Sequence, residues 1–218
     1  MILVQIARDG TTYTRDPRAI SAARAHFDRH HWVKLPRLLD PSLLAAVQKG
    51  LAAAQFVEWR HELVDPPSID LQMQPNATSA MLELVTNDRV LFDAIEDTTG
   101  CAGVARFSGF IYRLEPGHGH HHNWHNDVQS HRVVAMSINL EAAPYTGGTL
   151  QIRDRESERI VAEVENTGAG DAILFRISPR LQHRAVAVES GVKTAFAGWF
   201  RTASPLLQRF KKAAEASV

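Results

Sequence analysis

Short apolar stretches separated by glycine-containing turns make up the second half of the chain, from about residue 104 to residue 201. The clearest stretch is 132–140 (RVVAMSINL), in which large apolar residues occupy every second position from 134 to 140. Strict alternation places one set of side chains on each face of a strand. The apolar face predicts contact with a core, and the smaller, more polar face that carries Asn139 predicts the wall of a cavity.

Several further strands are expected in this half of the chain. They are predicted at 105–114, 149–153, 159–164, 172–175, 184–188 and 193–201. Because many short strands joined by Gly-rich turns are typical of sandwiches and jelly rolls, the pattern predicts one of these folds.

The first hundred residues have a different pattern, with mostly helical stretches. Helices are expected at 17–31, after the N-cap Asp40 with Pro41, and at about 80–97. Short extended pieces are expected at 1–7 and 32–35, and residues 66–76, which begin with two prolines, are expected to be irregular.

The length of 218 residues and the ordinary composition favour one domain over 1–218. The expected parts are a helical support region (1–100), a β core (101–203) and a C-terminal helix (204–218), which makes the fold mainly β with flanking helices.

The overall charge and cysteine content restrict the partners and the compartment. The net charge is zero, which argues against a duplex nucleic acid partner. Cys101 is the single cysteine, and no apolar run reaches membrane-spanning length. We therefore expect a cytoplasmic protein with neither a membrane nor a nucleic acid partner.

A group of chemically distinctive residues lies in the strand-rich half: His125-Asn126-Asp127, then His183, then Lys193. Residues i and i+2 point to the same side of an extended chain, so His125 and Asp127 can converge on one ion. Two histidines and one carboxylate on one face of a metal leave the opposite face open, as in non-haem Fe(II) oxygenases. Lys193 adds a cation that suits an anionic co-substrate.

A second His-x-Asp pattern, His26-Phe27-Asp28, serves as an internal control. It lies in the predicted helix 17–31, where residues i and i+2 diverge by about 200° around the axis. We therefore expect His26 and Asp28 to bind no metal together.

The segment from Tyr112 to Arg201 resembles the 2-oxoglutarate/Fe(II)-dependent dioxygenases, and especially their prolyl 4-hydroxylase-like branch. The matching pieces are Tyr112 with Glu115-Pro116-Gly117, His125-Asn126-Asp127, Arg132 with Leu140, Gly147-Gly148-Thr149-Leu150, Gly168 to Phe175, His183 with Ala185-Val186, and Lys193 with Trp199-Phe200.

The resemblance implies a double-stranded β-helix, with Fe(II), 2-oxoglutarate and O2 as cofactor and co-substrates and ascorbate as a further reductant. It implies that His125, Asp127 and His183 are iron ligands and that Lys193 pairs with the distal carboxylate of 2-oxoglutarate. Tyr112 matches a residue that lines the co-substrate pocket, and Asn139 stands where many members have tyrosine. Trp199 shares a strand face with Lys193 and is expected to form a wall of the pocket.

Other histidines are given weaker roles. The stretch 118–122 (HGHHH) is expected to be a mobile loop beside the iron, facing substrate, with adventitious binding of Ni(II) or Zn(II). Five histidines are interpreted as structural: His26, His30, His31, His61 and His131.

The resulting hypothesis is a hydroxylase that acts on a C–H bond of an amino-acid-like substrate, free or in a peptide, with proline among the candidates, and yields succinate and CO2. Residues 61–77 and 115–124 are the expected substrate loops. Two alternatives stay open: a Zn(II) hydrolase that uses the same triad, and a non-catalytic jelly-roll module that binds a small acid.

Overall fold

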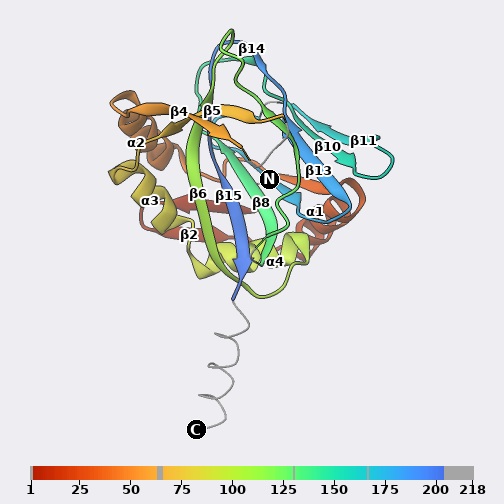
Figure 1. Cartoon of the computed structure of the whole chain (residues 1–218). Helices are drawn as coiled ribbons and strands as arrows, with labels where there is room; N and C mark the ends of the chain where they lie inside the picture. The colour runs from red at the N-terminus through yellow and green to blue at the C-terminus, as the bar shows by residue number, and fades with distance from the viewer. Residues whose placement is uncertain (1, 63–65, 130, 166, 204–218) are drawn as a thin grey trace.

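The computed structural model describes residues 2–62, 66–129, 131–165 and 167–203, which form a mainly antiparallel β fold with helices packed around it (Figure 1). The helices are α1 (Pro17–His30), α2 (Pro41–Ala52), α3 (Ala77–Val85) and α4 (Arg89–Thr99).

Two sheets form the β core. The larger sheet has the strand order β3 (Trp32–Leu35), β12 (Ala172–Arg176), β8 (Arg132–Asn139), β15 (Lys193–Thr202), β6 (Val104–Leu114), β5 (Ser68–Met73) and β4 (Phe56–His61). The smaller sheet has the order β11 (Ile160–Val164), β10 (Leu150–Asp154), β13 (Leu181–Ala185) and β7 (His122–His125). Two short pairs are β1 (Val4–Ala7) with β2 (Gly10–Tyr13), and β9 (Thr146–Gly147) with β14 (Val188–Ser190).

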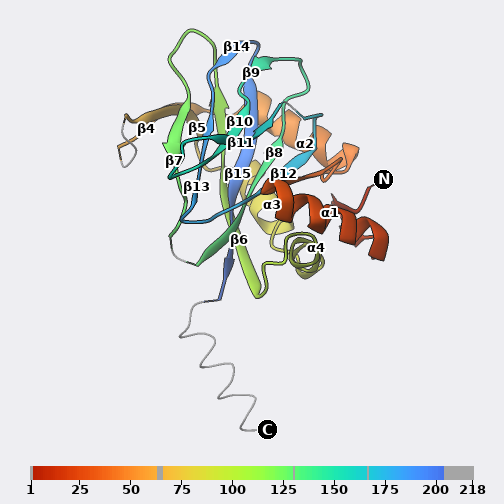
Figure 2. The ribbon, with the colours of Figure 1, turned by 90° about the vertical axis from the view of Figure 1, so that its right-hand side faces the viewer.

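The elements are arranged in layers. The helices cover one face of the larger sheet, and the smaller sheet lies over its other face (Figure 2). This arrangement confirms the predicted jelly-roll architecture with helical support. The predicted terminal helix at 204–218 lies outside the described residues.

The alternation predicted for 132–140 is present in β8. Val134, Met136 and Ile138 are fully buried in the main core, which they share with helix residues such as Phe27 and Val47. Ala135, Ser137 and Asn139 line the space between the two sheets, as expected for a cavity wall. The apolar face of β8 therefore packs against the core, and its more polar face lines the cavity.

Strand β15, next to β8, alternates in the same way. Phe196 and Phe200 enter the main core, whereas Lys193 and Trp199 face the cavity between the sheets. Gly198 lies where β15 pairs with β6, and a Cβ added there would approach the carbonyl oxygen of Ser108 to 2.1 Å. This close contact between backbones explains a glycine in the middle of a strand.

Local signals explain where the helices begin. Asp16 and Asp40 accept hydrogen bonds from the backbone N–H groups two residues on, and a proline follows each of them. The helix predicted at 80–97 is wrong in one respect, because the structure has two helices there. Asp88 caps the second, and Asn87 leaves the helical path to hydrogen-bond with the backbone of Phe107.

The irregular structure predicted for 66–76 is also wrong. Residues 68–73 form β5, which pairs with β4 on one side and β6 on the other. The strand predicted at 184–188 is displaced as well, since β13 ends at Ala185 and a separate strand, β14, begins at Val188. Within the described residues, no helix is both long and apolar enough to cross a membrane.

Candidate active site

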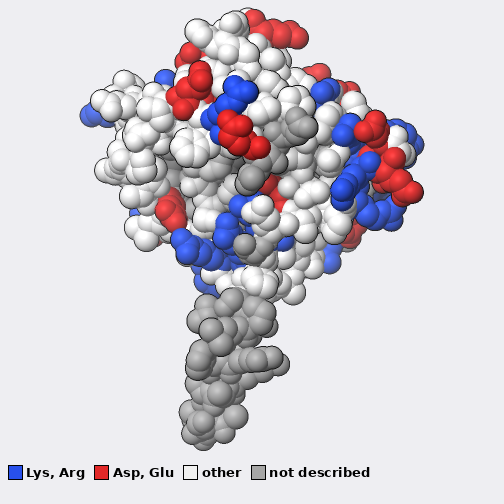
Figure 3. Space-filling view, viewed as in Figure 1, with Lys and Arg blue, Asp and Glu red and all other residues white. Residues whose placement is uncertain are grey.

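A cavity of about 730 Å³ lies between the two sheets. All seven residues singled out from the sequence line this cavity: Tyr112, His125, Asp127, Asn139, His183, Lys193 and Trp199. On the face shown in Figure 3, acidic and basic side chains lie interspersed around the surface. The seven residues chosen from the sequence therefore lie around one cavity.

Three of these residues form a compact group. His125 ends β7, Asp127 follows two residues later, and His183 lies in β13, directly paired with His125 across the sheet. Asp127 places one carboxylate oxygen 3.9 Å from Nε2 of His125 and the other 3.3 Å from Nε2 of His183. One nitrogen or oxygen atom from each side chain lies within 4.8 Å of the others. Ligands bonded to a metal at about 2.1 Å lie roughly 3 to 3.5 Å apart, so this group could hold one ion after small shifts.

His125 is in the form that a metal ligand needs. Its Nδ1 lies 2.7 Å from the carbonyl oxygen of Asn123, and because a carbonyl only accepts, Nδ1 carries the proton. Burial, followed by the nearby His183, lowers the pKa of His125 to about 3. The imidazole is therefore neutral, with the lone pair of Nε2 free.

Asp127 is held by two further side chains. Trp199 donates from Nε1 to Oδ2 at 2.6 Å, and Arg132 donates from Nη1 to Oδ1 at 3.2 Å. The Arg132 guanidinium also stacks over the Trp199 ring, 3.5 Å from its centroid. Burial alone would raise the pKa of Asp127, but hydrogen bonding with His183 and Trp199 outweighs it and lowers that pKa well below its ordinary value. Asp127 is therefore a fixed carboxylate.

Trp199 thus has a contact that the sequence analysis did not foresee. It was expected to form a wall of the pocket, and the structure shows that it also orients the carboxylate of Asp127. Arg132 was not included among the candidate site residues. A signal was available, because Arg132 belongs to the sequence pieces on which the family resemblance rests.

Lys193 begins β15 and directs its ammonium group into the cavity. Its Nζ donates to the carbonyl oxygen of Gly148. Gly148 has φ of +65°, and a Cβ there would approach Cδ of Lys193 to 2.9 Å, so glycine makes room for the lysine. Burial lowers the pKa of Lys193 to about 8. Among the described residues no carboxylate pairs with it, which leaves a buried cation able to bind an anion.

Tyr112 and Asn139 both line the cavity, at different places. Tyr112 is buried on β6, and its ring lies 4.8 Å from that of His122. Asn139 donates to the carbonyl oxygen of Thr167 and accepts from the N–H of Glu141. Its side chain therefore holds two loops together at the edge of the cavity.

The histidine-rich stretch differs from the expected mobile loop. His122 belongs to β7, and His121 forms an antiparallel bridge with Ile69 of β5. His120 is buried and accepts a hydrogen bond from the N–H of Glu115. This stretch is tied to the larger sheet by backbone pairing, which the local sequence does not reveal.

The structure also assembles a second group that the sequence analysis missed. His61, interpreted as structural, and His122 both contact Asp70, and one ligand atom from each lies within 4.8 Å of the others. His61 and His122 line the same cavity. The alternation of Ile69, Leu71 and Met73 with polar residues was the signal that could have placed Asp70 on a strand.

The helix predicted for the second His-x-Asp pattern is present. His26 and Asp28 lie on α1, with the buried Phe27 between them. Asp28 forms ion pairs with Arg24 and Arg176, and it belongs to neither of the two His/Asp groups.

Comparisons with known proteins show a family match for the strand-rich half of the chain. Residues 109–201, which include all seven candidate residues, match the model of the 2OG-Fe(II) oxygenase superfamily. A search of curated proteins finds no sequence that matches this chain.

Solved structures share the fold at low sequence identity. A Pseudomonas putida prolyl-4-hydroxylase is 18% identical with a TM-score of 0.60, covering 85% of this chain and 100% of that one. A Trichoplax adhaerens prolyl hydroxylase, solved with a hypoxia-inducible factor peptide fragment, is 14% identical with a TM-score of 0.64, covering 84% and 89%. The α-ketoglutarate-dependent epimerase SnoN from nogalamycin biosynthesis is 15% identical with a TM-score of 0.64, covering 87% and 83%.

The fold is therefore the jelly roll that the prolyl hydroxylases among these structures share. The segment that carries all seven candidate residues is similar to the 2OG-Fe(II) oxygenase superfamily, in agreement with the sequence resemblance.

Proposed function

We propose that this oxygenase hydroxylates a C–H bond of an amino-acid-like substrate, free or within a peptide, with proline among the candidates. The overall reaction combines the substrate R–H, 2-oxoglutarate and O2 to give R–OH, succinate and CO2. The observation that carries the proposal is the His125, Asp127 and His183 group in one cavity with the buried ammonium of Lys193.

The donor set fits Fe(II). Two imidazole nitrogens and one carboxylate are the ligands that non-haem iron oxygenases use, and the cavity gives access to the remaining positions. His125, Asp127 and His183 would hold the iron, which when bound supplies the activation of dioxygen. Arg132 and Trp199 keep the carboxylate of Asp127 oriented before the ion arrives, which reduces the cost of assembling the site.

Lys193 is the proposed partner of the distal carboxylate of 2-oxoglutarate. Its ammonium group is desolvated inside the cavity, so an incoming carboxylate would find a cation with few competing water molecules. Tyr112 lies on the same side of the cavity, on the strand that pairs with β15, and would contact the co-substrate beside Lys193. Asn139 would contribute by keeping the loop at Thr167 in place.

The mouth of the cavity suits a substrate with both apolar and charged groups. Trp59, Arg60 and Glu62 line it from β4 and the residue after that strand, and the Trp59 side chain is exposed. An aromatic surface beside charges of both signs can accept the mixed character of an amino acid or a short peptide. The prolyl hydroxylases among the structural neighbours support this class, whereas the epimerase shows that this fold also carries other reactions.

The alternative functions receive less support. A Zn(II) hydrolase has no use for an ammonium group at the far side of the cavity, and a module that only binds a small acid has no use for a His/Asp/His group. The family match favours neither of them.

Succinate release tests the proposal. Purified protein with Fe(II), ascorbate and 2-oxoglutarate should be screened against free amino acids, including proline, and prolyl peptides. The expected result is succinate formation that a substrate stimulates and that Asp127→Ala reduces to background. Stimulated hydrolysis that requires zinc and consumes no 2-oxoglutarate would overturn the proposal.

A further inference from the structure

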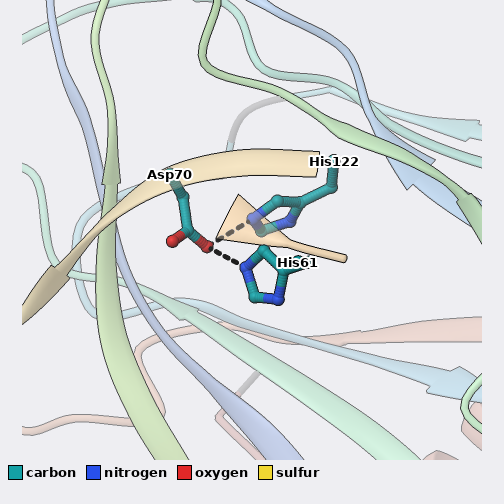
Figure 4. Close-up of side chains that lie close together, drawn as sticks. All are labelled: His61, Asp70 and His122. Carbon is teal, nitrogen blue, oxygen red and sulfur yellow. Dashed lines mark hydrogen bonds and ion pairs between the residues drawn. The ribbon is translucent and has the colours of Figure 1, made fainter. Parts of the chain in front are cut away.

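A second His/Asp/His group lies beside the same cavity, and two of its members line it. Its members come from three strands of two sheets: His61 ends β4, Asp70 lies in the middle of β5, and His122 begins β7. Nε2 of His61 and Nε2 of His122 lie 3.0 and 2.8 Å from the same oxygen, Oδ2 of Asp70 (Figure 4).

The carboxylate of this group is buried without a permanent cation beside it. Asp70 has no exposed surface, and the side chains that hydrogen-bond with its carboxylate are two histidines, which carry no permanent charge. Within the described part of the chain, no lysine or arginine forms an ion pair with Asp70. A buried carboxylate without a permanent cation is costly.

The second oxygen of the carboxylate is also unsatisfied. Oδ1 of Asp70 is buried and has no hydrogen-bond partner among the described residues. A cation close to the carboxylate would offset both deficits, because it would neutralise the charge that the two oxygens share. The two histidines offer nitrogen ligands on the side of Oδ2, and both face the cavity.

We propose that His61, Asp70 and His122 form a second metal site, which binds a divalent transition ion of the zinc class. Two imidazole nitrogens and one carboxylate oxygen suit Zn(II), which accepts such mixed ligands and tolerates four-coordinate geometry. The open position faces the cavity, where water or an oxygen atom of a substrate completes the coordination. This inference rests on the geometry and charge of the three residues and is independent of the proposed oxygenase reaction.

Metal stoichiometry tests the site. Metal-free protein is dialysed against Zn(II) and analysed for bound metal. The wild-type chain is expected to bind two equivalents, His61→Ala one, His183→Ala one, and the double variant none. The side chain of His61 is partly exposed, at 27%, so its removal is compatible with folding, and circular dichroism checks this.

A control excludes binding by the neighbouring surface histidines. His118 is exposed and His121 half-buried in the loop before β7, so His118→Ala/His121→Ala removes their imidazoles and keeps those of the proposed site. This variant is expected to retain two equivalents. Loss of the second equivalent in this variant, or its retention in His61→Ala, would overturn the proposal.

Spectroscopy adds a readout that does not depend on counting. Co(II) added to His183→Ala protein reports on the second group alone, and its visible absorption should disappear when His61 is also changed to Ala. An unchanged spectrum, or a wild-type chain that binds a single equivalent, would overturn the proposal and show that the three residues are held by hydrogen bonds alone.

Discussion

The two His/Asp/His groups of the cavity have the same composition but different support. In the first, Arg132 and Trp199 hold the carboxylate of Asp127 independently of the histidines. In the second, the histidines are the sole hydrogen-bond partners of the Asp70 carboxylate among the described residues. The first group is therefore organised before any ion binds, whereas the second depends on what neutralises Asp70.

The largest expected effect on catalytic activity is that of removing the Asp127 carboxylate from the first group. Asp127→Ala takes away an anionic ligand and leaves Arg132 without its ion-pair partner. We expect 2-oxoglutarate turnover to fall to background, measured as succinate release with saturating Fe(II). His61→Ala provides the comparison for bound iron, since it should leave one equivalent at His125, Asp127 and His183. If Asp127→Ala and His61→Ala lost bound iron to the same extent, the two groups would not bind metal independently.

The second-largest effect is expected on the binding of 2-oxoglutarate, when Lys193 is replaced. Lys193→Met keeps the length of the side chain but removes the charge that would hold the co-substrate, and hydrogen bonds to charged groups contribute about 1.5 to 3 kcal/mol. Because about 1.4 kcal/mol corresponds to a tenfold change in affinity, the KM for 2-oxoglutarate should rise about 10- to 100-fold. Lys49→Met, at an exposed position of α2, is the matched control. A normal KM in Lys193→Met would remove the proposed role.

The support of Asp127 can be weakened without changing a ligand. Trp199→Phe keeps an aromatic ring but removes the N–H that donates to Oδ2 of Asp127. Loss of a hydrogen-bond partner of a metal ligand typically costs about 10- to 100-fold in metal affinity. We expect a loss of iron affinity near the lower limit, about tenfold, because Arg132 still holds Oδ1. Trp59→Phe, at the mouth of the cavity, should leave iron affinity unchanged. An equal loss in both variants would contradict the role of the Trp199 hydrogen bond.

The pH dependence of co-substrate binding should reflect Lys193. Its pKa of about 8 means that the ammonium form, which attracts a carboxylate, is present below pH 8 and is lost as the pH rises through that value. Between pH 7 and pH 9 the Kd for 2-oxoglutarate should increase about tenfold in anaerobic titrations. In Lys193→Arg this rise should disappear, because arginine stays protonated. A rise of the same size in that variant would assign the pH dependence to another group.

The smallest effect is expected at the helical His-x-Asp pattern. His26→Ala should change neither the number of bound metal equivalents nor the KM for 2-oxoglutarate, because His26 lies on α1 outside both groups. Metal analysis of this variant shows how far a matching sequence pattern alone predicts a ligand. Loss of one metal equivalent in His26→Ala would mean that a His-x-Asp pattern binds metal even on a helix.

The contrast also explains what the sequence could predict. His125, Asp127 and His183 were recognisable because strand periodicity brings residues i and i+2 to one side and because the pattern 132–140 marks the neighbouring wall. The role of Lys193 came from the family resemblance, and strand periodicity then placed Trp199 on the same face as Lys193. The core face of β8 was predicted from the alternation at 132–140.

The second group could not be predicted in this way. Its members lie at positions 61, 70 and 122, and they meet because β5 pairs with β6 while His121 pairs with Ile69. These are long-range contacts, and the two prolines at 66 and 67 favoured an irregular interpretation of the segment. The contact between Trp199 and Asp127 was missed for a similar reason, since it depends on the path of the chain after β7.

The position of iron in the crystal tests the central claim most directly. Crystals grown anaerobically with Fe(II) and 2-oxoglutarate would be measured at the iron absorption edge. The account predicts an anomalous peak bonded to Nε2 of His125, Nε2 of His183 and a carboxylate oxygen of Asp127, with 2-oxoglutarate reaching from that peak to Nζ of Lys193. A bound iron away from these three side chains, or a co-substrate that leaves Lys193 without contact, would contradict it.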